Sequence, residues 1–183
     1  MSMYRHLVLM GLRASGKSTL GAAAAQAFAA PFVDLDDRTR EILGAATVRD
    51  AFRDAGEDRF RAAEANALAR ALGEVPQVIA LGGGTPTAPG ARELLEAARS
   101  AGRAYVVFLD LPLPLLAERL AAHEGDRPSL TGRGVVAELE VVAAARRPLY
   151  AALTDVRLLE PLRAEELVSI IASQVSSDSS TNG

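Results

Sequence analysis

A glycine-rich segment near the N-terminus sets the strongest constraint on the fold of this chain. It reads GLRASGKST from Gly11 to Thr19 and matches the pattern G-x-x-x-x-G-K-[ST]. In this pattern, backbone N–H groups and the start of the next helix converge on phosphate oxygens. Residues 6–10 before it are an apolar run typical of a buried strand, and the alanine-rich residues 19–29 after it are typical of a helix. The sequence therefore predicts a strand, a phosphate-binding loop and a helix, rather than a chance glycine-rich turn.

The only lysine of the chain lies in this loop. Lys17 is one of 20 lysine and arginine residues, and all the others are arginines. Its compact ammonium group suits the β- and γ-phosphates of a nucleoside triphosphate, and the Ser18 hydroxyl suits Mg²⁺. The nucleotide-binding residues that we expect here are Gly11, Ala14, Ser15, Gly16, Lys17, Ser18 and Thr19.

Apolar segments alternate with helical segments along the chain. The strands that we predict are residues 6–10, 32–35, 78–81, 104–110 and 156–159. The helices that we predict are residues 19–29, 36–43, 48–54, 57–72, 91–101, 114–122, 135–149 and 164–174. This alternation predicts an α/β fold with three layers, in which a five-stranded parallel sheet has helices on both faces. We expect one domain over residues 1–175 and a disordered tail over residues 176–183, which are rich in serine.

Composition excludes several classes of protein. The net charge of −3 and the pI near 5.5 argue against nucleic-acid binding. The chain has no cysteine, which excludes disulfides and thiolate metal sites and fits a reducing cytoplasm. Because the N-terminal residues lead straight into the first predicted strand, we expect no signal peptide, and the most apolar stretch is too short to span a membrane. We therefore expect a cytoplasmic protein that binds neither nucleic acid nor membrane. We also expect a monomer.

Two aspartates end the second predicted strand. Asp34 and Asp36 lie two residues apart, so strand alternation places their side chains on the same side. One carboxylate can hold Mg²⁺ through water while the other accepts the proton of a substrate hydroxyl, as in a small-molecule kinase. The alternative for such residues is capping of the next helix, a role that we assign to Asp37.

Two further groups of residues are candidates for anion binding. Arg61 and Glu64 share one face of a predicted helix, either as part of an anion clamp or as a surface ion pair. Three glycines after the third strand, residues 82–84, either offer N–H donors to an anion or form a flexible loop.

The polar segment 123–134 contains glycines and two arginines. Its composition suits a mobile lid that brings Arg127 onto a triphosphate, and suits an ordinary surface loop equally well. His6 and His123 have no partner in the sequence pattern, and we assign them no role.

In their order along the chain, these segments resemble those of shikimate kinases. The segments that carry the resemblance are GLRASGKSTLG, VDLDD, GEDRFRAAE, LGGGT, RPSL and RRPLY. The resemblance extends from Arg5 to about Ile170. It implies a P-loop kinase fold with a mobile lid, and transfer of a phosphoryl group from ATP, with Mg²⁺, to the 3-hydroxyl of shikimate.

The resemblance also implies a role for each matching residue. Catalysis is expected from Lys17, Asp36 and Arg127, of which Arg127 also contacts ATP from the lid. The metal is expected at Ser18 and Asp34. The acceptor, a ring with one carboxylate and three hydroxyls, is expected to contact Asp36, Arg61, Glu64, Gly82, Gly83, Gly84 and Arg146.

The sequence departs from the family pattern in two places, and other functions are compatible with it. Residues 156–163 differ from the family's usual adenine-loop stretch, so the adenine contacts stay unassigned, and Arg13 replaces a residue that is commonly small or apolar. The rivals are a gluconate-type or nucleoside monophosphate kinase and a non-catalytic sensor on the same scaffold. A regulatory GTPase needs an N-K-x-D element, which a chain whose only lysine is Lys17 does not contain.

Overall fold

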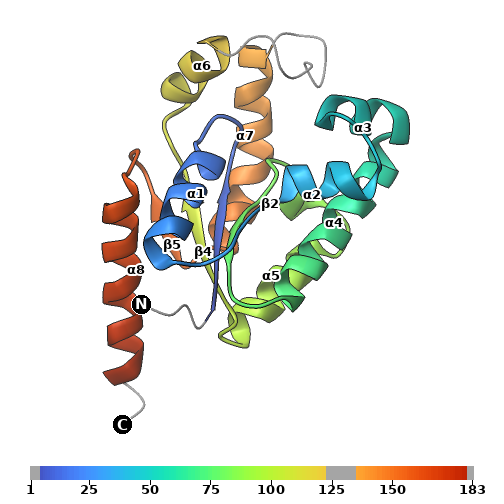
Figure 1. Cartoon of the computed structure of the whole chain (residues 1–183). Coiled ribbons are helices and arrows are strands. Elements are labelled where there is room, and N and C mark those ends of the chain that lie inside the picture. Colours follow the sequence, from blue (N-terminus) through green and yellow to red (C-terminus); the bar gives the residue numbers. More distant parts are fainter. Residues whose placement is uncertain (1–4, 123–134, 181–183) are drawn as a thin grey trace.

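Five strands alternate with eight α-helices in the part of the chain that the computed structural model describes, residues 5–122 and 135–180 (Figure 1). The strands are β1 (His6–Gly11), β2 (Phe32–Asp34), β3 (Val78–Ala80), β4 (Ala104–Leu109) and β5 (Val156–Leu158). The helices are α1 (Lys17–Phe28), α2 (Leu35–Ile42), α3 (Val48–Ala55), α4 (Glu57–Gly73), the 3₁₀ helix η1 (Thr85–Thr87), α5 (Ala91–Ser100), α6 (Leu113–Ala122), α7 (Val135–Ala152) and α8 (Ala164–Ser180). Every predicted strand and helix is present, with ends that differ by a few residues.

The five strands form one parallel sheet in the order β2-β3-β1-β4-β5, which confirms the predicted architecture. The central strand β1 pairs on one side with β3, Leu7 opposite Val78, and on the other with β4, Leu7 opposite Tyr105. Because all strands are parallel, their carboxyl ends lie along one edge of the sheet, where ligands bind in such folds. The loops that follow β1, β2 and β3 therefore meet at this edge.

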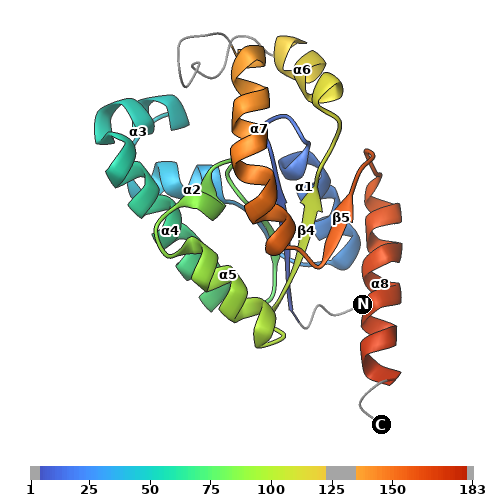
Figure 2. The ribbon, with the colours of Figure 1, turned by 180° about the vertical axis from the view of Figure 1, so that it is seen from behind.

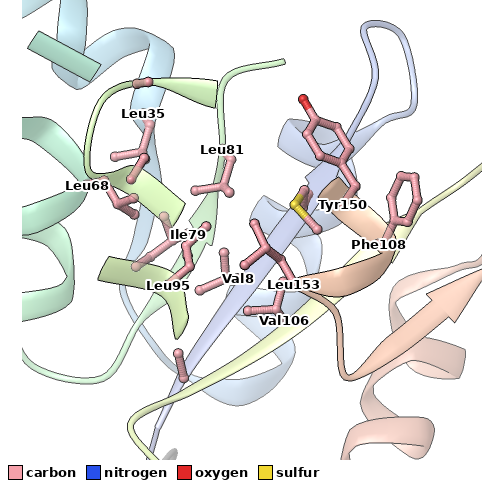
Figure 3. Packing of buried hydrophobic residues seen from close by; sticks show 14 of the residues in the cluster. Val8, Leu35, Leu68, Ile79, Leu81, Leu95, Val106, Phe108, Tyr150 and Leu153 are labelled. Atoms are coloured by element: carbon pink, nitrogen blue, oxygen red, sulfur yellow. The ribbon is translucent and has the colours of Figure 1, made fainter. Parts of the chain in front are cut away.

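Both faces of the sheet are covered by helices, as the views from opposite sides show (Figures 1 and 2). Leu7 and Leu9 pack with α1 and α8, whereas Val8 and Met10 pack with α4, α5 and α7. Figure 3 shows part of this second cluster. Strand alternation sends successive side chains to opposite faces, which explains why β1 is buried along its whole length. Within the described residues, none of the helices combines the length and the apolar character needed to cross a membrane.

The junction between β2 and α2 corrects two predictions. The helix begins at Leu35, so Asp36 lies in the first helical turn and does not alternate with Asp34 along a strand. The residue that caps the helix is Asp34, whose Oδ1 accepts a hydrogen bond from the Asp36 N–H at 3.0 Å. The capping role assigned to Asp37 was wrong, because this exposed side chain lies 3.6 Å from Arg40 instead. The carboxylate of Asp34 thus accepts from one of the free N–H groups at the start of the helix, two residues after it.

The predicted lid and the predicted tail differ in what the structure describes of them. The predicted lid, residues 123–134 with Arg127, and His123 lie outside the described residues. Helix α8 continues to Ser180, into the segment 176–183 for which the composition predicts disorder. Once the first turns of α8 pack against α1 through the buried Leu167, each further residue adds a helical hydrogen bond at little cost.

The packing of β3 leads to a prediction of stability. Ile79 is fully buried between β1 and β2, opposite Val8 and Val33. Ile79→Ala should lower the free energy of unfolding by about 2–4 kcal/mol in urea titrations, because it leaves a cavity in a rigid layer. The control Val75→Ala removes a side chain that is 66% exposed and should change the free energy by less than about 0.5 kcal/mol. Equal effects of the two substitutions would contradict the packing described here.

Candidate active site

The loop between β1 and α1 has a backbone shaped for an anion. Ala14 and Gly16 adopt positive φ angles of 61° and 90°, and such turns direct successive N–H groups inward. Gly11 is required by a close approach: an added Cβ would lie 2.7 Å from the Ser15 Oγ and 2.9 Å from the Leu109 carbonyl oxygen. The loop therefore has the concave form that the sequence pattern predicts.

Lys17 lies at the mouth of this loop as the first residue of α1. It is 8% exposed, and its Nζ donates to the Leu12 carbonyl oxygen at 3.0 Å and to the Ser15 Oγ at 3.4 Å. The positive charge is thus held within the same concave surface as the inward N–H groups. Such a surface favours an anionic group with several oxygens.

Ser18 and Asp34 place two oxygen atoms side by side. The Ser18 hydroxyl donates to the Asp34 Oδ2 at 2.5 Å, while the other Asp34 oxygen caps α2. Burial raises the pKa of Asp34, and the hydrogen bond from Ser18 opposes that rise. Within residues 5–122 and 135–180 no cluster of three or more His, Cys, Asp or Glu side chains suits a metal. A cation held by Ser18 and Asp34 would therefore need water or ligand oxygens as well, which is the usual situation for Mg²⁺.

A cavity of about 900 Å³ runs along the loop. Its walls come from the loop itself, from Asp36 and Gly83, and from α6 and residues 160–165. Arg119 of α6 reaches the loop, where its Nη1 donates to the Ala14 carbonyl oxygen at 3.2 Å. Arg13 lines the cavity beside Gly83, with its Cγ 3.4 Å from the position of an added Cβ there. The cavity thus extends from the phosphate loop to a second wall that combines apolar and charged side chains.

Two of the three glycines after β3, Gly82 and Gly84, are packed tightly against charged side chains. An added Cβ at Gly82 would collide with the Asp36 Oδ1 and lie 2.9 Å from the Glu64 Oε1. At Gly84 it would collide with the Arg61 guanidinium. Glycine is needed here for close approach. This finding decides against a merely flexible loop.

Arg61 and Glu64 form a mostly buried pair rather than a surface ion pair. The Arg61 Nη1 lies 2.6 Å from the Glu64 Oε2, and their side chains are 16% and 2% exposed. The other Glu64 oxygen accepts from the Thr85 hydroxyl at 3.0 Å. Burial raises the pKa of Glu64, while Arg61 and Thr85 act in the opposite direction. Glu57, 3.6 Å away, lies at the exposed side of the guanidinium.

Arg146 of α7 faces the same space as Arg61. Both line a second cavity of about 460 Å³, together with Glu57, Asp58, Thr87 and Pro89. The Arg146 Nη1 donates to the Gly83 carbonyl oxygen at 2.6 Å. The glycine triple is therefore shared by the two cavities, with Gly83 on the wall of the first and Gly84 against Arg61 of the second.

The structure gathers most of the predicted site residues at the carboxyl edge of the sheet. Those that it brings together are Lys17, Ser18, Asp34, Asp36, Arg61, Glu64, Gly82, Gly83, Gly84 and Arg146. Arg127 lies outside the described residues.

Sequence reasoning missed three residues of this site. Tyr150 belongs to the site because its hydroxyl donates to the Gly83 carbonyl oxygen at 2.6 Å. Thr85 follows the glycine triple directly, and Tyr150 lies four residues after Arg146 on the same helix, so spacing would have pointed to both. Arg119 carried no such signal, because its contact with the loop depends on how α6 packs.

A phosphate loop, a paired serine and aspartate, and a neighbouring cavity with two arginines define a P-loop kinase that acts on a small anionic acceptor. Residues 13–176 match the family model described as shikimate kinase. The chain belongs to the shikimate kinase family, and it is accordingly an ATP-dependent kinase.

Individual relatives agree with this assignment. A shikimate kinase of Symbiobacterium thermophilum is 41% identical over 155 residues, which are 84% of this chain and 85% of that protein. The structure of shikimate kinase from Acinetobacter baumannii in complex with shikimate has a TM-score of 0.82 at 27% identity, and the match covers 95% of this chain and 94% of that one. A gluconokinase structure from Sinorhizobium meliloti has a TM-score of 0.61 at 21% identity and full coverage, a likeness of fold alone.

The packing around the glycine triple leads to a second prediction. Gly82→Ala should lower the free energy of unfolding by about 1–3 kcal/mol, because the added methyl collides with oxygens of three side chains. The matched control is Gly73→Ala at the end of α4, where an added Cβ meets nothing within 4 Å. This control should leave stability unchanged or raise it by about 0.5 kcal/mol. The close approach would be refuted if both variants unfolded at the same urea concentration.

Proposed function

We propose that this protein transfers the γ-phosphate of ATP to the 3-hydroxyl of shikimate and releases ADP and shikimate 3-phosphate. One observation carries the proposal: Arg61 and Arg146 line one cavity that adjoins the nucleotide cavity at the glycine triple. Two guanidinium groups in one small cavity suit a carboxylate, which arginine binds through paired hydrogen bonds. The hydroxyls of a ring held by its carboxylate then reach towards Asp36.

In this proposal Asp36 activates the acceptor. It lies in the first turn of α2, against the backbone of Gly82 and on the wall of the nucleotide cavity. A carboxylate there can accept the proton of the hydroxyl as that oxygen attacks the γ-phosphorus and the bond to ADP breaks. Lys17 opposes the negative charge of the phosphoryl group in flight. The lid arginine that we expect for the same purpose is Arg127.

The residues present fit a bound Mg²⁺. The Ser18 hydroxyl would bind the ion directly and the Asp34 carboxylate through water, as their adjacent oxygens allow. When bound, the ion draws charge from the β- and γ-phosphate oxygens. The chain's own part is to hold these two oxygens in place, with Asp34 fixed by its hydrogen bond from the Asp36 N–H.

The nucleotide base is expected at the other end of the larger cavity. Arg119 and Leu120 of α6 line this cavity together with residues 160–165, which include Pro161 and Leu162. The flat aromatic face of a base fits between an arginine plane and apolar side chains. We therefore assign the adenine contacts, left open by the sequence, to these residues.

Two alternatives follow from the same scaffold. A gluconate-type kinase would also need a phosphate loop, and gluconate also carries a carboxylate that the arginine pair could bind. The match to the shikimate kinase family favours shikimate as the acceptor. A non-catalytic sensor would not need Asp36 beside the nucleotide cavity. As part of the proposal, the enzyme is a cytoplasmic monomer with a single kinase domain over residues 1–175.

The experiment that tests the acceptor is shikimate-dependent release of ADP, compared with gluconate and AMP. We expect ADP release with shikimate as the acceptor and none with gluconate or AMP. Arg61→Lys should raise the KM for shikimate about tenfold, because lysine cannot form the paired hydrogen bonds. The control Arg53→Lys changes a side chain that is 65% exposed on α3 and should leave the KM unchanged. Turnover with gluconate but not with shikimate would overturn the proposal.

The role of Asp36 makes a separate prediction. Asp36→Asn should lower kcat by about 10²–10⁴-fold while ATP binding, measured by calorimetry, stays as in the wild type. Asp37→Asn is the matched control, because Asp37 is exposed one residue further along and pairs with Arg40. If Asp36→Asn turns over as fast as the control, Asp36 is not the proton acceptor.

A further inference from the structure

Tyr150 is a buried residue of α7 that the mechanism above does not use. Its side chain lies in the core next to Phe108, with ring centroids 5.5 Å apart and planes at 84° (Figure 3). Its hydroxyl donates to the Gly83 carbonyl oxygen at 2.6 Å. Burial raises the pKa of Tyr150 to about 12, so the phenol keeps its proton and stays a donor.

The carbonyl groups of the glycine triple are held in two different ways. The Gly82 and Gly84 carbonyl oxygens accept from the turn that follows, through the N–H groups of Thr85 and Thr87 at 3.1 and 2.9 Å. The Gly83 carbonyl oxygen accepts instead from the distant helix α7, through Arg146 and Tyr150 at 2.6 Å each. The orientation of the middle carbonyl is therefore set by α7.

Fixing this carbonyl also fixes an N–H donor. The Gly83 C=O and the Gly84 N–H belong to one planar trans peptide unit and point in opposite directions. Gly84 lies against the Arg61 guanidinium. A rotation of the Gly83 carbonyl would thus turn the Gly84 N–H and disturb the surface beside Arg61.

The two donors to Gly83 differ in what else they can do. Arg146 also lines the acceptor cavity, and a bound carboxylate would compete for its guanidinium. Tyr150 is fully buried and has one hydroxyl proton to donate, and the same hydroxyl is hydrogen-bonded to the Arg146 side chain. It can hold the carbonyl while Arg146 reorients towards the acceptor.

The helix that carries Tyr150 is itself anchored beside the site. Arg147 donates to the buried Asp110 carboxylate at 2.8 Å and to the Leu111 carbonyl oxygen at 3.2 Å. These bonds fix the position of α7, and with it Tyr150, relative to the end of β4.

We propose that Tyr150 is a positioning residue for the acceptor. Tyr150 holds the Gly83–Gly84 peptide in place, so that shikimate meets a preformed surface when Arg146 turns towards the shikimate carboxylate. The inference rests on the proposed function. It assigns the tyrosine hydroxyl to acceptor binding rather than to core packing alone. Its effect should appear in the KM for shikimate and leave the nucleotide site unaffected.

The test compares two tyrosine-to-phenylalanine variants in steady-state assays. Tyr150→Phe should raise the KM for shikimate about fivefold to tenfold, with kcat and the KM for ATP close to those of the wild type. The matched control Tyr105→Phe removes the same atom from a tyrosine in the core on the other face of the sheet, and should leave the KM for shikimate unchanged. 4-Aminophenylalanine at position 150, introduced by nonsense suppression, restores a donor and should restore the KM.

Several outcomes would overturn the proposal. One is a Tyr150→Phe variant with a lower Tm but an unchanged KM for shikimate, which would make Tyr150 a packing residue only. Another is an equal rise in the KM for ATP. If Tyr150→Phe does not fold, the comparison passes to 4-aminophenylalanine and 4-methylphenylalanine at position 150, and equal KM values for shikimate in these two would also refute it. Absence of shikimate turnover in the wild type would instead refute the proposed function.

Discussion

The close contact between a glycine backbone and charged side chains is the constraint on which the site depends. Gly82 and Gly84 have no side chains, and the space that a Cβ would occupy is taken by Asp36 and Arg61. Because β1 and β3 are neighbours in the sheet, the loop after β3 lies next to the phosphate loop after β1, and both loops line the nucleotide cavity. Donor and acceptor cavities thus become adjacent without any long connecting segment.

A buried carboxylate fixes the remaining geometry on the acceptor side. Glu64 is 2% exposed, and burying its charge is costly unless each oxygen has a partner. One oxygen is paired with Arg61 on the same helix and the other with Thr85, which comes from the turn after the glycine triple. Loss of either partner would leave a buried charge unsatisfied. The pair therefore fixes the guanidinium against α4 and ties α4 to the glycine loop.

Much of this fold could be predicted from the sequence, because the patterns that indicate strands, helices and the phosphate loop each lie within a short stretch of the chain. Alternation of apolar strands and helices predicted the parallel sheet, and G-x-x-x-x-G-K-[ST] predicted the phosphate loop. Local spacing failed at the start of α2, where the cap is Asp34 rather than Asp37. It also left the burial of Arg61 undecided, because that depends on Thr85 and Gly84, which are distant in sequence.

The single lysine described at the outset has a consequence for chemical labelling. Lys17 supplies the only side-chain primary amine of the chain, and it lies buried at the mouth of the phosphate loop. An amine-directed reagent therefore has one side-chain target, whose rate of modification reports on the occupancy of this loop alone. In most proteins such a signal is hidden among many surface lysines, whereas the arginine-rich surface of this protein is silent to the same reagent.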